Sequence, residues 1–348
     1  MNWSRVFGVA GGLVGVVGLL AVGAWWWFGK PIYVPGHLAE RTDLDPIGDE
    51  LASTLQVAPG IALHAFEEGE GPLTVVVHGG PGRPPADVWP ALHQLTEERR
   101  MLYVHQRGSG RSTRPIDRPR ASGYMARMAE VEQTLGLGQQ IADIERIRRL
   151  SGEEQIDLVG HSFGGFLAAM YAAEFPSRVR SLVLIAPAAV LVAPSEDADL
   201  FGSIREQLNG DEQSQFDAFL KRYLDFSPTR FENGDADEVA LHEELGRWYL
   251  RAVREAVHTP AAETGGWMTT AMYASMGLRH DYRGALAEVT APTLVLHGSE
   301  DLQPLSVSQR YADHIPGARL QVIDGAGHMP HVSHADAVAS AIRGIAGP

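Results

Sequence analysis

The chain has 348 residues, of which 45% are hydrophobic and 21% are charged, a composition typical of a folded globular protein with a sizeable core. Its formal net charge of −14 argues against the basic surface that binding to phosphate backbones requires, so we expect no nucleic-acid partner. The absence of cysteine excludes thiol catalysis, disulfides and cysteine-bound metals.

The amino terminus carries a long uncharged run. Residues 6–28 contain no charged side chain, and three tryptophans stand near its end, before Lys30. A run of this length can span the roughly 30 Å hydrocarbon core of a bilayer as a helix, and tryptophans favour the interface. We therefore expect residues 1–28 to be a single-pass membrane anchor, with the rest of the chain outside the cytoplasm. A cleaved secretory signal with Val22-Gly23-Ala24 as the cleavage site is the alternative.

Residues 29–48 combine proline and charge without periodicity, which predicts a linker. After them, short apolar runs bounded by glycine alternate with segments of helical spacing. Runs that are apolar throughout are typical of strands buried on both faces of a parallel sheet. The expected strands are 73–78, 101–105, 156–160, 181–185, 293–297 and 320–323, and the expected helices include 140–150, 166–175 and 335–345. This alternation predicts a mostly parallel, doubly wound α/β sheet.

The alternation breaks after about residue 190, and only helical patterns follow until about residue 283. They lie at 201–208, 213–223 and 239–257. We therefore expect a helical cap at 190–285, inserted between a first core segment at 49–189 and a second at 286–348.

The sequence Gly160-His161-Ser162-Phe163-Gly164 lies between a predicted buried strand and a predicted helix. A nucleophilic serine on a sharp strand-to-helix turn needs small residues two positions before and after it, and both are glycine here. The turn also leaves the backbone N–H of Phe163 in position to stabilise an oxyanion. We interpret Ser162 as a nucleophile.

A serine hydroxyl needs a base, and the base needs an acid that orients it. His328 lies in a glycine-rich loop after the last predicted strand, and Asp301 follows the strand at 293–297. Both positions are at the carboxyl edge of the sheet, where open α/β sheets place their sites. The alternative acid is the adjacent Glu300. His331 and His334 follow His328 at three-residue intervals, but no further ligand is in register, so we expect solvated side chains rather than a metal site.

The sequence His78-Gly79-Gly80-Pro81-Gly82 directly follows a predicted strand. Consecutive glycines let a backbone N–H approach a developing oxyanion without interference from a Cβ atom. We therefore expect Gly79 and Gly80 to complete the oxyanion hole with Phe163.

Five motifs together resemble the proline iminopeptidase-like branch of the α/β-hydrolases: HGGPG at 78–82, QRGSGRS at 106–112, GHSFGG at 160–165, GSEDLQP at 298–304 and GAGHMP at 325–330. The resemblance covers roughly residues 50–348. It implies an α/β-hydrolase fold with a helical cap, the order serine, aspartate, histidine, no cofactor, and cleavage of short peptides with a free N-terminal residue, often proline.

Two positions depart from that family. His105 stands before QRG where the family usually has aspartate. In the family, acidic cap residues near a Trp–Glu pair bind the substrate ammonium, and this sequence has no such pair. Acidic residues outnumber basic ones in the cap, so a cationic substrate is one interpretation. The candidate substrate-binding residues are Glu243, Glu244, Glu255 and Trp248.

Three functions are compatible with these residues. The first is an aminopeptidase that releases N-terminal proline or a similar residue. The second is a carboxylesterase, or another ester, lactone or amide hydrolase, that uses the same groups. The third is a non-catalytic binding protein, which would leave a complete set of catalytic residues without a purpose. The expected partner is in each case a small molecule or short peptide.

Overall fold

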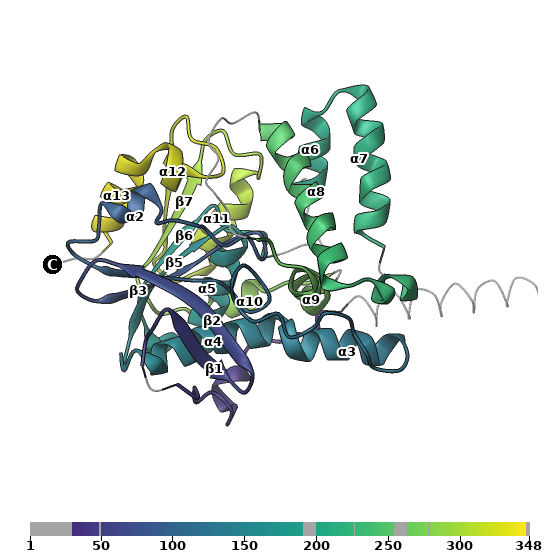
Figure 1. The fold of residues 1–348 in the computed structure, drawn as a ribbon. Helices are drawn as coiled ribbons and strands as arrows, with labels where there is room; N and C mark the ends of the chain where they lie inside the picture. The colour runs from purple at the N-terminus through teal and green to yellow at the C-terminus, as the bar shows by residue number, and fades with distance from the viewer. Residues whose placement is uncertain are drawn as a thin grey trace, which may run out of the picture.

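The structure is a computed structural model that describes residues 30–48, 50–190, 200–225, 227–253, 263–277 and 279–345. Eight strands form one sheet in the order β1-β2-β4-β3-β5-β6-β7-β8 (Figure 1). The strands are β1 Thr54–Ala58, β2 Ile61–Glu68, β3 Leu73–Val77, β4 Arg100–Val104, β5 Ile156–His161, β6 Val179–Ile185, β7 Thr293–Gly298 and β8 Arg319–Ile323. From β4 to β8 all neighbours pair in parallel.

The six expected strands are all present, with ends that differ by at most two residues from the prediction. The sequence patterns missed β1 and β2, which form an antiparallel pair at one edge of the sheet. In β2 buried and half-buried residues alternate, as expected for a strand with one face turned towards solvent. A search for continuous apolar runs cannot find such a strand.

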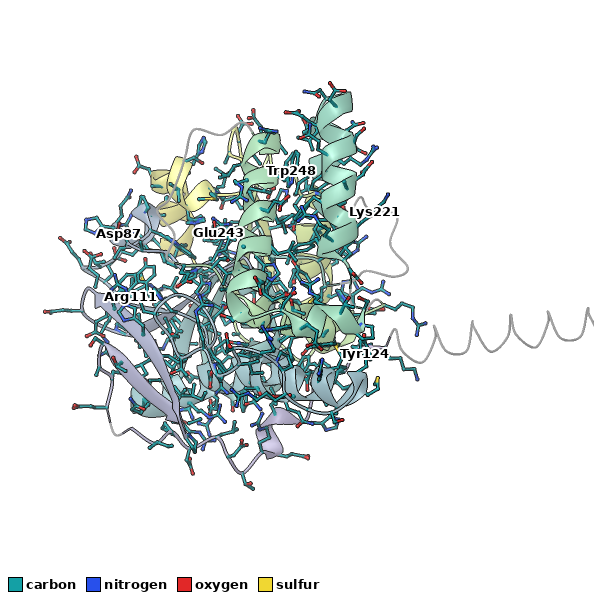
Figure 2. The ribbon with its side chains drawn as sticks, turned by 45° about the vertical axis from the view of Figure 1, so that its right-hand side comes forward. Asp87, Arg111, Tyr124, Lys221, Glu243 and Trp248 are labelled. Carbon is teal, nitrogen blue, oxygen red and sulfur yellow. The ribbon has the colours of Figure 1, made fainter. Side chains whose placement is uncertain are left out.

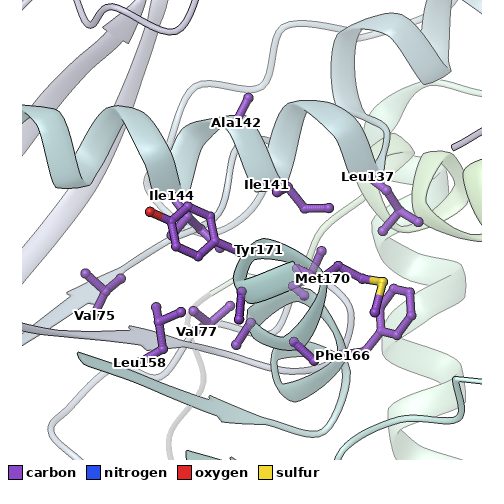
Figure 3. Packing of buried hydrophobic residues seen from close by; sticks show 14 of the residues in the cluster. Val75, Val77, Leu137, Ile141, Ala142, Ile144, Leu158, Phe166, Met170 and Tyr171 are labelled. Carbon is purple, nitrogen blue, oxygen red and sulfur yellow. The ribbon is translucent and has the colours of Figure 1, made fainter. Parts of the chain in front are cut away.

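Successive residues of each central strand point to opposite faces of the sheet. In β3 all of these residues are buried, so helices cover both faces. Val75 and Val77 contribute to one core with helices α4 and α5, whereas Val76 contributes to a second core with α2 and α13. Figure 3 shows part of the first core. The helices outside the cap are α2 Pro90–His93, α3 Tyr124–Leu135, α4 Leu137–Leu150, α5 Phe163–Glu174, α9 Trp267–Met276, α10 Arg283–Leu286, α11 Leu305–His314, α12 Pro330–Ser333 and α13 Ala335–Arg343, with short 3-10 helices η1 Leu38–Glu40, η2 Pro176–Arg178 and η3 Pro228–Glu232.

Three helices form the cap, α6 Leu200–Gln207, α7 Gly210–Tyr223 and α8 Asp235–Val253 (Figure 1). They have an apolar cluster of their own that includes Phe216 and Phe219. Helix α9 lies inside the predicted cap range of 190–285, but its buried Trp267 and Met272 belong to the main core. The cap is therefore smaller than predicted, because α9 packs with the sheet domain.

The segment that was predicted to be a linker is attached to the core along the length that the structure describes. It has little regular structure, but Tyr33, Leu38 and Leu44 are buried. The buried carboxyl group of Glu174 accepts hydrogen bonds from the Tyr33 hydroxyl at 2.7 Å and from the backbone N–H groups of Gly36 and Leu38 at 3.0 Å. The linker prediction is wrong for residues 30–48, because lack of periodicity does not imply lack of packing.

The predicted membrane anchor, residues 1–28, lies outside the described residues. Within the ranges that the structure describes, no helix is long and apolar enough to cross a membrane.

The attachment of this segment can be tested at Tyr33. We predict that Tyr33→Phe lowers the free energy of unfolding by about 1.5–3 kcal/mol, because a hydrogen bond to a buried carboxyl group is lost. Urea unfolding measures the change, with Tyr124→Phe as the control, since Tyr124 is 37% exposed and no hydrogen bond of its hydroxyl is found among the described residues. Equal stability of Tyr33→Phe and the unmutated protein would show that the segment is not held in this way.

Candidate active site

Ser162 lies on a strained turn between β5 and α5. Its φ and ψ angles are 54° and −123°, a conformation that residues with a Cβ rarely adopt. A Cβ on Gly160 would overlap the carbonyl oxygen of Gly164, and a Cβ on Gly164 would overlap the carbonyl oxygen of Val77. The two flanking glycines are therefore needed for the turn, and the serine projects from the carboxyl edge of the sheet.

The loop after β3 lies directly against this turn. A Cβ on Gly79 would lie 2.9 Å from Cβ of Ser162 and 2.8 Å from the carbonyl oxygen of His161. The Phe163 N–H, in the first turn of α5, has no intrahelical acceptor. Gly79 and Gly80 line the same cavity as Ser162, and an oxyanion hole formed with Phe163 stays a prediction.

His78 fixes the orientation of the glycine loop. Its Nε2 accepts a hydrogen bond from the Gln106 backbone N–H at 3.1 Å, so the proton of the neutral ring is on Nδ1, which donates to the Gly79 carbonyl at 3.0 Å. The Arg83 N–H donates to the same carbonyl at 3.0 Å. Because the carbonyl and the N–H of one trans peptide point in opposite directions, the Gly80 N–H is directed away from His78. Burial lowers the pKa of His78 to about 3, so the ring stays neutral.

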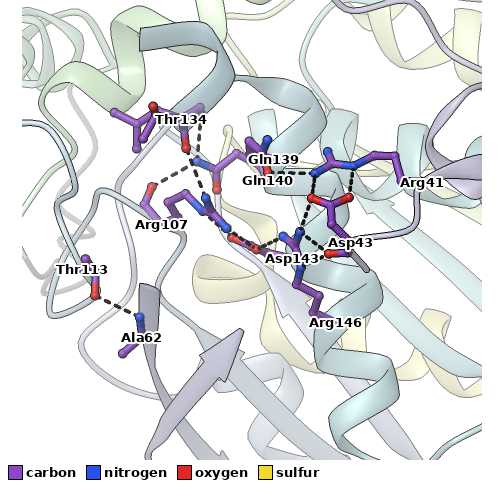
Figure 4. A network of polar contacts seen from close by, with 11 residues as sticks. Arg41, Asp43, Ala62, Arg107, Thr113, Thr134, Gln139, Gln140, Asp143 and Arg146 are labelled. Carbon is purple, nitrogen blue, oxygen red and sulfur yellow. Dashed lines mark hydrogen bonds and ion pairs between the residues drawn. The ribbon is translucent and has the colours of Figure 1, made fainter. Parts of the chain in front are cut away.

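A buried ion pair holds the loop that contacts His78. The guanidinium of Arg107 donates to both carboxylate oxygens of Asp143 on α4, at 2.8 and 2.7 Å (Figure 4). The next residue back, Gln106, donates from its side chain to the His78 carbonyl at 2.9 Å. The QRG motif therefore connects the glycine loop to a helix of the core.

His328 and Asp301 are brought together from two loops at the sheet edge. Nδ1 of His328 lies 2.8 Å from Oδ2 of Asp301, and the Asp301 side chain is 1% exposed. Burial by itself would raise the pKa of Asp301, but the charge and hydrogen bond of His328 and the backbone N–H of Gln303 outweigh it and lower the pKa. Glu300, the alternative acid, is exposed. His328 and Ser162 line the same cavity.

His161 ties the serine turn to the histidine loop. Its Nε2 lies 2.9 Å from the carbonyl oxygen of His328, so Nε2 carries the proton and donates. Burial, together with the neighbouring His328, lowers the pKa of His161 to about 3. The ring therefore stays neutral and acts as a fixed donor beside the nucleophile.

The expectation of a solvated His331 is wrong. The side chain is buried, with its ring 4.3 Å from Trp89 and 4.5 Å from His161. His334 is half-buried and contacts Ser333. Among the described residues, no group of three or more His, Asp or Glu side chains could hold a metal ion.

A cavity of about 210 Å³ lies between the cap and the sheet edge. Ser162 and His328 line it from below, together with Gly79 and Gly80. The cap contributes two residues of α6, one of α7 and five of α8, none of which sequence reasoning selected: Leu200, Ile204, Tyr223, His242, Leu245, Gly246, Tyr249 and Leu250. Positions 242, 245, 246 and 249 have the spacing of residues on one face of a helix, and this spacing could have identified the α8 residues from the sequence.

The predicted cap residues lie elsewhere. Glu243 and Trp248 lie on α8 (Figure 2), as does Glu244, and none of the three lines the cavity. Glu244 pairs with Arg222 at 2.8 Å, and Trp248 packs against Phe216 in the cap cluster. Glu255 lies outside the described residues. The expected interaction of Glu243, Glu244 or Trp248 with substrate is therefore not supported by their position.

Comparison with known proteins agrees with this geometry. Residues 72–335 match the family described as the alpha/beta hydrolase fold. The chain belongs to this α/β-hydrolase family.

Individual members of the family differ in activity. A proline iminopeptidase from Lactobacillus delbrueckii subsp. lactis is 28% identical over 266 residues, 74% of this chain and 84% of that protein. A 2-hydroxymuconate semialdehyde hydrolase from Pseudomonas sp. (strain CF600) is 29% identical over 295 residues, 82% and 90% of the two chains. The solved structure of the esterase EaEST from Exiguobacterium antarcticum has a TM-score of 0.58 at 19% identity, covering 84% of this hydrolase and 98% of that chain. This last likeness concerns the fold alone.

The role of the two central residues is tested by removing each alone and both together. We predict that Ser162→Ala and His328→Ala each lower kcat about a millionfold, and that the double variant is no slower, because nucleophile and base act as a unit. Turnover of 4-nitrophenyl butyrate measures this, with His334→Ala as the control that keeps full activity. Fluorophosphonate labelling at a serine other than Ser162 would contradict the assignment.

The role of His78 can be distinguished by kinetics from the roles of Ser162 and His328. We predict that His78→Leu lowers kcat about ten- to a hundredfold and leaves KM nearly unchanged, because the Gly79–Gly80 peptide loses its fixed orientation and an oxyanion donor acts only in the transition state. Steady-state kinetics on the same ester measures both constants. The control is His93→Leu, on an exposed position of α2. A rise in KM at constant kcat would assign His78 to ground-state binding instead.

Proposed function

We propose that this α/β-hydrolase is a serine hydrolase that cleaves small esters or related acyl compounds through an acyl-enzyme on Ser162. One observation carries the proposal: a single small cavity joins Ser162, His328 and the glycine loop, and its other described walls are mainly apolar. Apolar cavities with a few fixed polar groups are typical of small-molecule sites.

The chemistry follows from the contacts. Nε2 of His328 takes the proton of the Ser162 hydroxyl, and the oxygen attacks the substrate carbonyl carbon. The N–H groups of Phe163 and Gly80 stabilise the oxyanion, and the departing group takes the proton from His328. Water then repeats the sequence on the acyl-enzyme and releases the acid. Asp301 stabilises the imidazolium in both steps.

An aminopeptidase is the second candidate, favoured by the HGGPG and QRGSGRS motifs and by the similarity to the Lactobacillus enzyme. The cavity argues against it. None of the described residues that line the cavity is Asp or Glu, so these walls offer no carboxylate to a substrate ammonium. The relatives do not choose between the candidates, because a peptidase and a semialdehyde hydrolase are about equally similar to this chain.

The two candidates differ in their response to a free amine. We predict rapid hydrolysis of 4-nitrophenyl butyrate and little turnover of prolyl 4-nitroanilide, with no gain from its free amine relative to the N-acetylated form. The wall residues that the structure describes supply no carboxylate that would select a free amine. Comparison of kcat/KM for the three reporters measures this. A hundredfold preference for the free-amine amide would overturn the esterase proposal and establish the aminopeptidase.

A further inference from the structure

Arg83 is a charged residue of the active-site cavity that the catalytic steps do not use. It directly follows the HGGPG motif, and its backbone N–H holds the Gly79 carbonyl. Its side chain is half-buried and lines the cavity together with Ser162 and Gly80. The guanidinium is therefore fixed, through its own backbone, to the loop that forms the oxyanion hole.

The charge of Arg83 has no counterpart among the described residues. Its guanidinium forms no hydrogen bond or ion pair with any of them, and no described wall residue of the cavity carries a carboxylate. Three other buried or half-buried arginines do have such a partner: Arg107 pairs with Asp143, Arg114 with Asp235 and Arg230 with Glu238. A partly buried cation has lost part of its hydration, and here no carboxylate replaces it. An anion that enters the cavity therefore has its most favourable electrostatic interaction with this guanidinium.

The cap is shaped to accept this side chain. A Cβ on Gly246 of α8 would overlap Nη1 of Arg83. Arg83 therefore crosses from the glycine loop to the cap at the point where α8 carries no side chain. One turn earlier on the same helix, the buried and neutral His242 also lines the cavity. A second polar atom thus lies on the helix face that Arg83 contacts.

We propose that Arg83, with His242 beside it, forms a subsite for a carboxylate on the substrate. The inference rests on the proposed acyl hydrolysis and narrows it to esters or related compounds that carry a carboxylate near the scissile carbonyl. A guanidinium binds a carboxylate through two parallel hydrogen bonds. The carboxylate belongs either to the acyl part or to the leaving group, and matched substrates distinguish the two.

Two substrate pairs test the subsite. Monomethyl glutarate and methyl pentanoate differ by a carboxylate on the acyl part, and 4-acetoxybenzoate and 4-methylphenyl acetate differ by a carboxylate on the leaving group. We expect the unmutated enzyme to prefer the carboxylate in at least one pair. In that pair, Arg83→Met should lower kcat/KM for the anionic ester about ten- to a hundredfold and leave the neutral ester unchanged. Arg83→Lys should retain part of the preference, because charge remains but the bidentate geometry is lost.

Two matched variants separate the subsite from general effects. Gly246→Ala should push the flexible guanidinium aside and abolish the preference, whereas Gly210→Ala on α7, where a Cβ meets nothing within 4 Å, should not. Arg247→Met removes a positive charge from an exposed position of α8 and should also leave the preference intact. If Arg247→Met and Arg83→Met lowered the preference for the anionic ester equally, long-range electrostatic attraction would explain that preference, and the subsite would be overturned.

Binding provides a readout that does not depend on turnover. Ser162→Ala should bind monomethyl glutarate or 4-acetoxybenzoate in calorimetry, and Ser162→Ala combined with Arg83→Met should bind it at least tenfold more weakly. Hydrolysis of neutral esters without a carboxylate preference would overturn the subsite and leave the proposed function standing. Failure to hydrolyse any ester would overturn the proposed function, and the calorimetry would still decide whether Arg83 holds a carboxylate.

Discussion

In this fold two backbone segments at the active site lie so close together that side chains would not fit between them. The glycine loop after β3 and the turn at Ser162 come so near that a Cβ on Gly79 or Gly164 would meet backbone or Cβ atoms of the other segment. An oxyanion hole built from backbone N–H groups needs this distance, because its donors have no flexible side chain with which to reach the substrate. Most features of the sheet edge serve to maintain that approach.

A buried ion pair and two buried, neutral histidine rings maintain it. The chain of contacts runs from Asp143 on α4 through Arg107 and Gln106 to His78, and ends on the Gly79 carbonyl. On the other side His161 connects the serine turn to the His328 backbone. Each neutral ring has one nitrogen committed as a donor, so the loops that carry nucleophile, base and oxyanion donors are positioned before substrate arrives. Such preorganisation lowers the reorganisation needed in the transition state.

The sequence placed Ser162 and Asp301 at the carboxyl edge because each follows a strongly apolar strand, and His328 because it follows the last predicted strand in a glycine-rich loop. It did not reveal how His78 is used, because a motif names residues and not the hydrogen bonds that select a tautomer. The edge pair β1–β2 escaped because its alternating pattern is weaker than a continuous apolar run. Composition alone also cannot show which cap carboxylates are free for a substrate: Glu238, Asp235 and Glu244 are paired with arginines.

The central claim is that this arrangement makes Ser162 a covalent nucleophile. The most direct measurement is rapid-quench mass spectrometry of the unmutated protein with 4-nitrophenyl acetate, followed by peptide mapping. The account predicts a transient acetyl group on Ser162 that forms and decays at rates compatible with turnover. Continued turnover with no adduct, or with an adduct on a different residue, would contradict it.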